Sequence, residues 1–373
     1  MAARSDEGGR HPEMTSAGIP SASSPASSDA CPSVFVRQLD ESFARAAAAT
    51  HENTLTLRLA GRTVRITFAG DALVPIVRGA LAPRLSANGE GPPDLTLKLW
   101  DARTTGVCAP LPLGAPSAYG PHGEIQGYGA QPVFAAYSLD SGALSVLDAE
   151  SATGFFWVRD VRNLTLHELG APLLSLFGWF FRARGTQLVH AAAVGRGGQA
   201  LLLAGRGGSG KSTTALACLV AGLEHIADDY ALVSGVPRPV VHALHATAKL
   251  NADSLARLPL FARAIGNPGR DAEEKALLHL GPAAGIRLAE SATLRAVVLP
   301  CVRAGGVPAL TPIAAGEALR ALAPSTIFQM AGAGASTFAS LGALVKAVPA
   351  FRLDLGSDLS AVAACVARLL PPA

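Results

Sequence analysis

Hydrophobic and polar side chains alternate along the early part of the chain with the period of a β-strand. Positions 54–59 and 63–68 each place an apolar residue at every second position, and the pair Gly61-Arg62 lies between them. A period of two puts successive side chains on opposite faces, so the pattern predicts a half-buried β-hairpin.

The same reading extends this region into a small domain over residues 33–163. Further elements are a helix, an alternating strand, Pro/Gly-rich loops and three more strands, predicted at 71–85, 95–99, 103–131, 133–139, 143–149 and 153–159. The Asp140-Ser141-Gly142 turn joins two of these strands. We expect a mainly antiparallel α+β domain. Residues 1–32 are rich in Ser, Ala, Pro and Gly, and we expect a disordered tail there.

Residues 164–186 are rich in Leu, Phe and Trp and predict a helical connector packed between two domains. A membrane-surface helix is the alternative, but the polar face of this segment is not lysine-rich. From residue 187 to 373, strands alternate with helices, which is typical of an α/β domain. Its later elements are a strand, two helices, a strand and a closing helix, predicted at 294–300, 315–322, 336–347, 351–355 and 358–370, with Pro324 beyond the end of the first helix.

Composition excludes several classes of protein. The longest nearly unbroken apolar stretch, 171–181, is shorter than the roughly 20 residues that cross a bilayer, and no secretory signal is evident, so we expect a cytoplasmic protein without a membrane span. The 5 cysteines are scattered, which argues against a disulfide framework. The net charge of +3 arises without basic runs, so nucleic acid is not an expected partner. A homo-oligomer is compatible with the sequence.

A glycine-rich motif follows the apolar run 199–204. The segment matches G-x-x-x-x-G-K-[ST] between a predicted strand and a predicted helix, which is the context of a phosphate-binding loop. Only 5 of the 31 basic residues are lysines, so a motif that demands lysine carries weight. The alternative is a glycine-rich turn that binds nothing. The expected nucleotide-binding residues are Gly205, Arg206, Gly207, Gly208, Ser209, Gly210, Lys211, Ser212 and Thr213.

The residue types of this loop predict its chemistry. Backbone N–H groups and the helix N-terminus would surround phosphate oxygens, Lys211 would reach the β- and γ-phosphates of ATP, and the Ser212 hydroxyl would bind Mg²⁺.

An acidic pair lies a short distance beyond the loop. The helix that starts at Lys211 is expected to end at Gly222, and a short strand then leads to Asp228 and Asp229. At the end of a strand, both carboxylates can face the ligand crevice, where one binds Mg²⁺ and the other accepts a proton. In the alternative reading the pair only caps a turn.

Three segments together resemble a known family. Val189-His190-Ala-Ala-Ala-Val, the Gly-Lys-Ser loop and Ala221-Gly-Leu-Glu-His-Ile-Ala-Asp-Asp229 are similar to the catalytic core of HPr kinase/phosphorylase, to which phosphoenolpyruvate carboxykinase is related. The resemblance covers about 45 residues and implies a P-loop kinase fold. It further implies that Asp228 is the general base, that Asp229 is a metal or substrate ligand and that His190 orients the base. Taken alone, His190 would be read as a core residue.

One feature of that family has no counterpart here. The Glu-Leu-Pro and Arg-rich second signature is absent, so neither HPr as substrate nor the reverse phosphorolysis is expected. Lys249 and Lys275 are candidate contacts to the substrate or its phosphates, with a solvated surface position as the alternative. The pair His242 and His245 lacks an evident third ligand and is a poor metal site.

The sequence thus predicts an ATP- and Mg²⁺-dependent kinase that phosphorylates a hydroxyl, most readily a serine, on a peptide, protein or small molecule. A nucleotide sensor without phosphotransfer is the alternative. A transport or motor ATPase is a third reading, but no LSGGQ-like or N-K-x-D-like segment is found.

Overall fold

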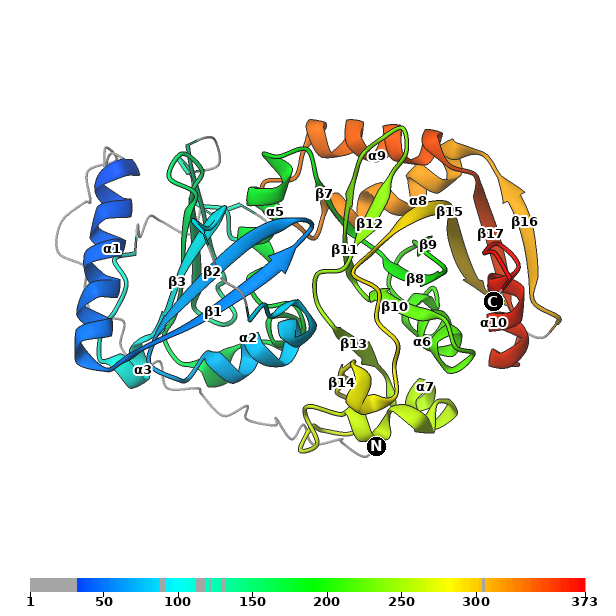
Figure 1. Ribbon diagram of the computed structural model, residues 1–373, viewed down its shortest axis with the longest axis horizontal. Helices are drawn as coiled ribbons and strands as arrows, with labels where there is room; N and C mark the ends of the chain where they lie inside the picture. The colour runs from blue at the N-terminus through cyan, green and yellow to red at the C-terminus, as the bar shows by residue number, and fades with distance from the viewer. Residues whose placement is uncertain are drawn as a thin grey trace, which may run out of the picture.

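The computed structural model describes residues 32–87, 91–111, 119–120, 122–128, 132–303 and 306–372. Two halves lie side by side in Figure 1, each built around a β-sheet. The predicted tail lies outside the described residues, apart from Pro32. Across the described part of the chain, no helix is both long and apolar enough to cross a membrane.

The predicted hairpin is confirmed and forms one edge of the first sheet. Within the described residues this sheet has the strand order β1-β2-β3-β6-β5-β4. The β1–β2, β4–β5 and β5–β6 pairs are antiparallel, whereas β2–β3 and β3–β6 at the centre are parallel. The bounds are β1 Glu52–Leu59, β2 Arg62–Ala69, β3 Leu95–Asp101, β4 Val133–Tyr137, β5 Ala143–Asp148 and β6 Thr153–Val158. The sheet is therefore mixed, because helical crossovers and a hairpin separate its central strands along the chain.

Helices cover both faces of this sheet. Helix α1 (Pro32–Ala49), for which the sequence reading gave no element, buries its apolar face against Trp100 and Trp157 on the outer side (Figure 1). The other face packs against α2 (Val74–Leu81) and α5 (Leu174–Arg182). Short helical turns complete this half: η1 Ala82–Arg84, α3 Ala102–Thr105 and η3 Val161–Asn163.

The connector consists of two helices, α4 (Leu166–Gly170) and α5, in place of the single helix predicted. They are separated at Leu173, whose φ of +63° is a left-handed conformation that an α-helix cannot contain. Helix α5 supplies Phe177 and Phe181 to a core that also contains Leu188 and Leu232 from the second half. The expected packing between the halves is thus confirmed.

The second half contains a larger mixed sheet. Its described strands run in the order β10-β8-β9-β15-β12-β11-β7, and β17 pairs with both β15 and β16. Strand β9 is parallel to β15, and β15 is parallel to β17, while the remaining pairs are antiparallel. The bounds are β7 Gln187–His190, β8 Ala192–Arg196, β9 Gln199–Leu203, β10 Glu224–Ala227, β11 Tyr230–Ser234, β12 Val240–His242, β15 Ser291–Val302, β16 Ala309–Ile313 and β17 Ala350–Leu355. The structure is thus of the mixed α/β class.

One face of this sheet packs against α6 (Lys211–Val220) and α10 (Leu359–Ala367), and the other against α8 (Ala315–Ile327) and α9 (Ala335–Ala347). The prediction that Pro324 lies beyond its helix is wrong, since α8 continues through it. Proline removes one backbone hydrogen-bond donor from the helix. Helical hydrogen bonding continues beyond it, since the Phe328 N–H donates to the Pro324 carbonyl.

A small layer closes the lower side of the second half in Figure 1. Strands β13 (Thr247–Leu250) and β14 (Ala276–His279) pair antiparallel, with α7 (Ala252–Arg257) and η4 (Pro259–Ala264) between them in sequence and η5 (Pro282–Ala284) after them. This layer also touches the first half, because Ala246 N–H donates to the Ala80 carbonyl at 2.8 Å.

Candidate functional site

The glycine-rich segment connects β9 to α6, the strand–loop–helix order that its motif requires. The strand is buried because it lies between β8 and β15, and the helix begins at Lys211 with Gly210 at its N-cap. Arg206, Gly207 and Gly208 form the exposed tip of the loop. Whether the loop binds phosphate stays a prediction at this stage.

Two glycines in this loop could not be replaced without strain. Gly210 has a φ of +96°, and a Cβ atom there would approach Leu355 Cδ1 to 2.6 Å. Gly205 has a φ of +147°, and its Cβ would approach the Ser209 hydroxyl oxygen to 2.8 Å. A side chain at Gly207 or Gly208 would instead meet open space. The loop therefore curls tightly while its tip leaves room for a ligand beside the backbone.

The Lys211 side chain folds back over the loop. Its Nζ atom donates to the Gly205 carbonyl at 2.7 Å and to the Arg206 carbonyl at 3.2 Å. Burial lowers the pKa of Lys211, and the nearby carboxylates of Asp229 and Asp228 partly offset that effect. An ammonium held only by neutral carbonyls at the mouth of a cavity is available to an anionic ligand.

Asp228 is buried at the turn between β10 and β11, with only 4% of its surface exposed. Burial raises the pKa of Asp228, the neighbouring Asp229 raises it further, and a hydrogen bond from Ser212 opposes the shift. The Lys249 backbone N–H donates to Oδ2 at 3.4 Å, whereas Oδ1 is buried and has no hydrogen-bond partner. An unsatisfied buried carboxylate oxygen is costly, and a cation beside it would remove the cost.

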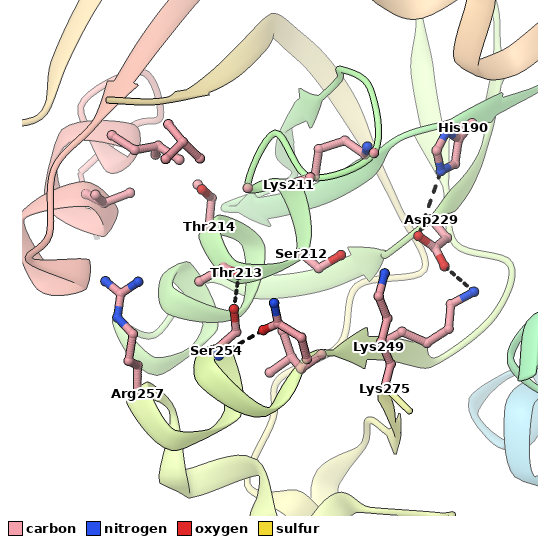
Figure 2. Close-up of a pocket in the computed structure, with 18 of the residues that line it drawn as sticks. His190, Lys211, Ser212, Thr213, Thr214, Asp229, Lys249, Ser254, Arg257 and Lys275 are labelled. Atoms are coloured by element: carbon pink, nitrogen blue, oxygen red, sulfur yellow. Dashed lines mark hydrogen bonds and ion pairs between the residues drawn. The ribbon is translucent and has the colours of Figure 1, made fainter. Parts of the chain in front are cut away.

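Asp229 is the more accessible carboxylate and lies between two basic side chains (Figure 2). Lys249 Nζ lies 2.7 Å from Oδ2, and His190 Nε2 lies 3.8 Å from Oδ1. Burial opposes ionisation, but the interactions with His190 and Lys249 prevail and hold the pKa of Asp229 below its usual range. Its φ of +63° is unusual for a residue other than glycine. Asp229 is therefore ionised and aimed into the cavity.

Sheet register explains why His190 reaches this carboxylate. Strands β7 and β11 pair so that His190 lies opposite Tyr230, the residue that follows Asp229. The sequence assigned His190 to orient Asp228, but the ion-pair distance is to Asp229. Tyr230 also packs against the His190 ring at 5.3 Å and donates from its hydroxyl to Gln329 at 3.3 Å.

These groups surround a cavity of about 820 Å³, within the size range of ligand pockets. Most of the predicted site residues line it, whereas Asp228 lies behind its wall and Gly205, Arg206 and Ser209 shape the loop. Predicted residues on the lining are His190, Gly207, Gly208, Gly210, Lys211, Ser212, Thr213, Asp229, Lys249 and Lys275.

The cavity also contains polar residues that the sequence reading missed. They come from the α4–α5 region, from α7 and from the ends of β15 and β17: His167, Asn251, Ser254, Arg257, Arg303 and Ser357. Ser254 lies 2.9 Å from the Thr213 hydroxyl, so α7 is tied to the first turn of α6. Asn251 caps α7, and a capping residue two positions after the candidate contact Lys249 was a signal that could have located this wall.

The two other histidines singled out in the sequence do not form a site. His242 bonds to the Ser234 hydroxyl at 2.8 Å, and His245 bonds to the Pro172 carbonyl at 2.9 Å. Among the described residues, no group of three or more His, Cys, Asp or Glu side chains is placed to hold a metal ion.

Mg²⁺ fits the donor set at the loop. The Ser212 hydroxyl and the unpartnered Asp228 oxygen are hard oxygen ligands on neighbouring elements. Mg²⁺ generally binds through one or two protein oxygens together with phosphate oxygens and water, so a small donor set is what such a site requires.

No protein-family model matches the chain, and no curated protein is significantly similar to it. Among solved structures, the chain is similar to the Hpr(Ser) kinase/phosphatase from Coxiella burnetii, with 11% sequence identity and a TM-score of 0.27 over 49% of this chain and 95% of that chain. At this level the match establishes neither the family nor the activity.

Proposed function

We propose that the protein is a kinase that uses ATP and Mg²⁺ to phosphorylate a hydroxyl group, with the seryl hydroxyl as the leading acceptor. The observation that carries the proposal is the placement of Asp229. An ionised carboxylate, paired with His190 and Lys249, faces the same cavity as the glycine-rich loop and Lys211 (Figure 2). Phosphate binding alone would not require such a group, whereas transfer to a hydroxyl requires a proton acceptor.

The loop and the basic side chains account for nucleotide binding. Backbone N–H groups at the loop tip and the N-terminus of α6 favour phosphate oxygens. Lys211 would exchange its carbonyl partners for the β- and γ-phosphates. Charged phosphate oxygens form stronger hydrogen bonds with a buried ammonium than neutral carbonyl oxygens do. Lys275 and Arg257 border the same cavity and add positive charge to it.

The two aspartates have different roles, one in metal binding and the other in proton transfer. Asp228 lies beside Ser212 and is nearly inaccessible, so it suits the metal side of the site. Asp229 is accessible and would accept the proton of the acceptor hydroxyl, while His190 and Lys249 fix its orientation. This reverses the roles that the sequence resemblance implied. Mg²⁺ bound at Ser212 and Asp228 would neutralise charge on the transferring phosphoryl group.

The transfer step balances without a further reactant. The acceptor oxygen forms a bond to the γ-phosphorus, the bond from that phosphorus to the bridging oxygen breaks, and ADP leaves. The acceptor proton passes to Asp229. A loose phosphoryl-transfer transition state needs positioning more than a strong base, which is consistent with the low pKa of this carboxyl.

The test is incubation with γ-labelled ATP and a panel of seryl peptides and hydroxyl metabolites. Label should pass to an acceptor in the wild type and fall by at least about 100-fold in Lys211→Ala. Lys346→Ala is the matched control, since Lys346 lies on the exposed end of α9. Undiminished transfer in Lys211→Ala would overturn the proposal, and rapid hydrolysis of ATP without any acceptor would indicate an ATPase.

A further inference from the structure

A second cavity lies beside the first, between the two halves of the molecule. It has a volume of about 180 Å³ and shares three lining residues with the larger cavity: His122, His167 and Gln329. His167 lies edge-on to Tyr230 at 5.6 Å, and Tyr230 in turn packs on His190. The wall that the two cavities share is therefore next to the side chains that hold Asp229.

The walls of this second cavity are mainly apolar and come from both sides of the interface. Helix α2 of the first half contributes Ile76 and Val77, the α4–α5 segment contributes Pro172 and Leu173, and the second half contributes Ala331. Leu173 is the residue in the left-handed conformation that separates the two helices. The bend at this residue thus forms part of the cavity wall.

The hollow exists because small side chains occupy one row of the first sheet. Ala136 on β4 lies opposite Ser145 on β5, and Ser145 lies opposite Phe156 on β6. All three line the cavity, and the two small residues leave the space that larger ones would fill. The Glu168 carboxylate also borders it, but it accepts hydrogen bonds from Ser141 and Thr165, so it is already satisfied.

The size of the cavity limits what it can hold. An apolar cavity of about 150 Å³ accommodates benzene, so about 180 Å³ admits an isobutyl or phenyl group. A nucleotide could not fit there, and its phosphates would find neither lysine nor arginine among the lining residues.

We propose that this second cavity binds an apolar group attached beside the hydroxyl of the acceptor, so that the acceptor is a hydroxyl compound with an isobutyl- or phenyl-sized substituent. The proposal rests on the proposed kinase function, because it places the hydroxyl at Asp229 and the substituent past His167. The first half of the molecule then determines which acceptor is used, while the second half holds the nucleotide and the proton acceptor.

Turnover provides the first arm of the test. Leucinol is compared with alaninol, and the peptide Ser-Leu is compared with Ser-Gly. The first pair tests an amino alcohol as the acceptor, and the second pair tests a seryl peptide with the same isobutyl group. We expect kcat/KM to be about 10- to 100-fold higher for the larger substituent in at least one pair. The preference should disappear in Ser145→Leu, which fills the cavity, with ATP affinity unchanged. Equal kcat/KM within both pairs would overturn the inference while leaving the kinase function in place.

Binding provides a second arm that does not depend on catalysis. Ligand-observed NMR should detect leucinol on the wild type and on the control Ala262→Leu, which adds the same bulk at an exposed position of η4. The signal should be lost in Ser145→Leu and in Ala136→Leu, two variants used in case one does not fold. Absence of binding of both leucinol and Ser-Leu to the folded wild type would overturn the inference. Binding with no transfer to any acceptor would support the cavity and reject the kinase.

Discussion

Lys249 Nζ lies 2.7 Å from Asp229 Oδ2, and the two residues come from different layers of the second half. Lys249 is on β13, in the small two-stranded sheet, whereas Asp229 ends the turn between β10 and β11 of the main sheet. This ion pair therefore fixes the position of the candidate proton acceptor relative to the wall of the cavity.

Lys249→Met should move the acid limb of the pH–rate profile to higher pH. The ammonium helps to hold the pKa of Asp229 low, so its removal raises that pKa and the carboxylate is protonated earlier as pH falls. Transfer at neutral pH should fall about 100-fold, the loss typical for one electrostatic group in an active site. Measurement of kcat/KM across pH checks this, with Lys249→Arg expected to keep the limb close to that of the wild type. An acid limb at the same pH in Lys249→Met would mean that the pair does not control Asp229.

Asp229→Asn should abolish transfer and leave ATP binding intact. The amide cannot accept the hydroxyl proton, and loss of a general base lowers rates by about 100- to 10,000-fold. Titration of ATP by calorimetry, with label transfer measured in parallel, separates the two effects. If biological activity survived in this variant with no transfer, the protein would be a nucleotide sensor.

Asp228→Asn should stabilise the protein at pH 8 and weaken its response to Mg²⁺. The pKa of Asp228 is raised in the folded state, so ionisation of this buried carboxyl costs stability above the unfolded value of about 4. Acidification protonates Asp228 and removes that cost, so the difference from Asp228→Asn should shrink toward pH 4.

We expect a gain of about 1–2 kcal/mol at pH 8, measured by urea denaturation. The Mg²⁺ concentration needed for half-maximal transfer should rise at least about tenfold. Asp253→Asn on the exposed side of α7 is the control and should change neither quantity. A variant less stable than the wild type at pH 8 would show that Asp228 has a counter-charge in the folded protein.

Trp179→Ala should destabilise the whole molecule by about 3–5 kcal/mol. The indole is buried on α5, stacks on Phe134 at 5.7 Å between ring centroids and donates to the Ala331 carbonyl at 3.0 Å. Its removal leaves a cavity between the two halves and an unpaired carbonyl. Chemical denaturation measures the change, and Phe338→Ala at a half-exposed site on α9 should cost less than about 1 kcal/mol. Equal losses in the two variants would contradict a joining role for α5.

Local patterns in the sequence anticipated much of the fold. The hairpin β1–β2 followed from strict alternation. The closing helix expected at 358–370 is α10 (Leu359–Ala367), whose N-cap Asp358 accepts from the Ser360 and Ala361 N–H groups. Helix α1 was missed although Phe35, Leu39 and Phe43 repeat every four residues, a helical signal. The parallel centre of the first sheet could not be predicted, since pairing order depends on contacts distant in sequence.

The candidate site likewise has one part that the sequence revealed and another that depends on tertiary packing. The loop and the acidic pair were visible because the chemistry of each lies within a few consecutive residues. The partnership of His190 with Asp229 depends on which strands pair, and the approach of Lys249 depends on where the two-stranded β13–β14 sheet packs. The second cavity depends on small residues from separate strands meeting across a sheet, which no single segment of the sequence reveals.

The aromatic core around α5 has a consequence for truncation and for unfolding of the protein. Phe177 and Phe181 belong to the same buried cluster as Leu188, Tyr230 and Leu232. A fragment beginning at Gln187 would carry every group assigned to the chemistry yet expose this cluster to water, and it would tend to aggregate. The first half therefore keeps an apolar face of the second half out of water, and heating the intact chain should melt both sheets in one cooperative transition.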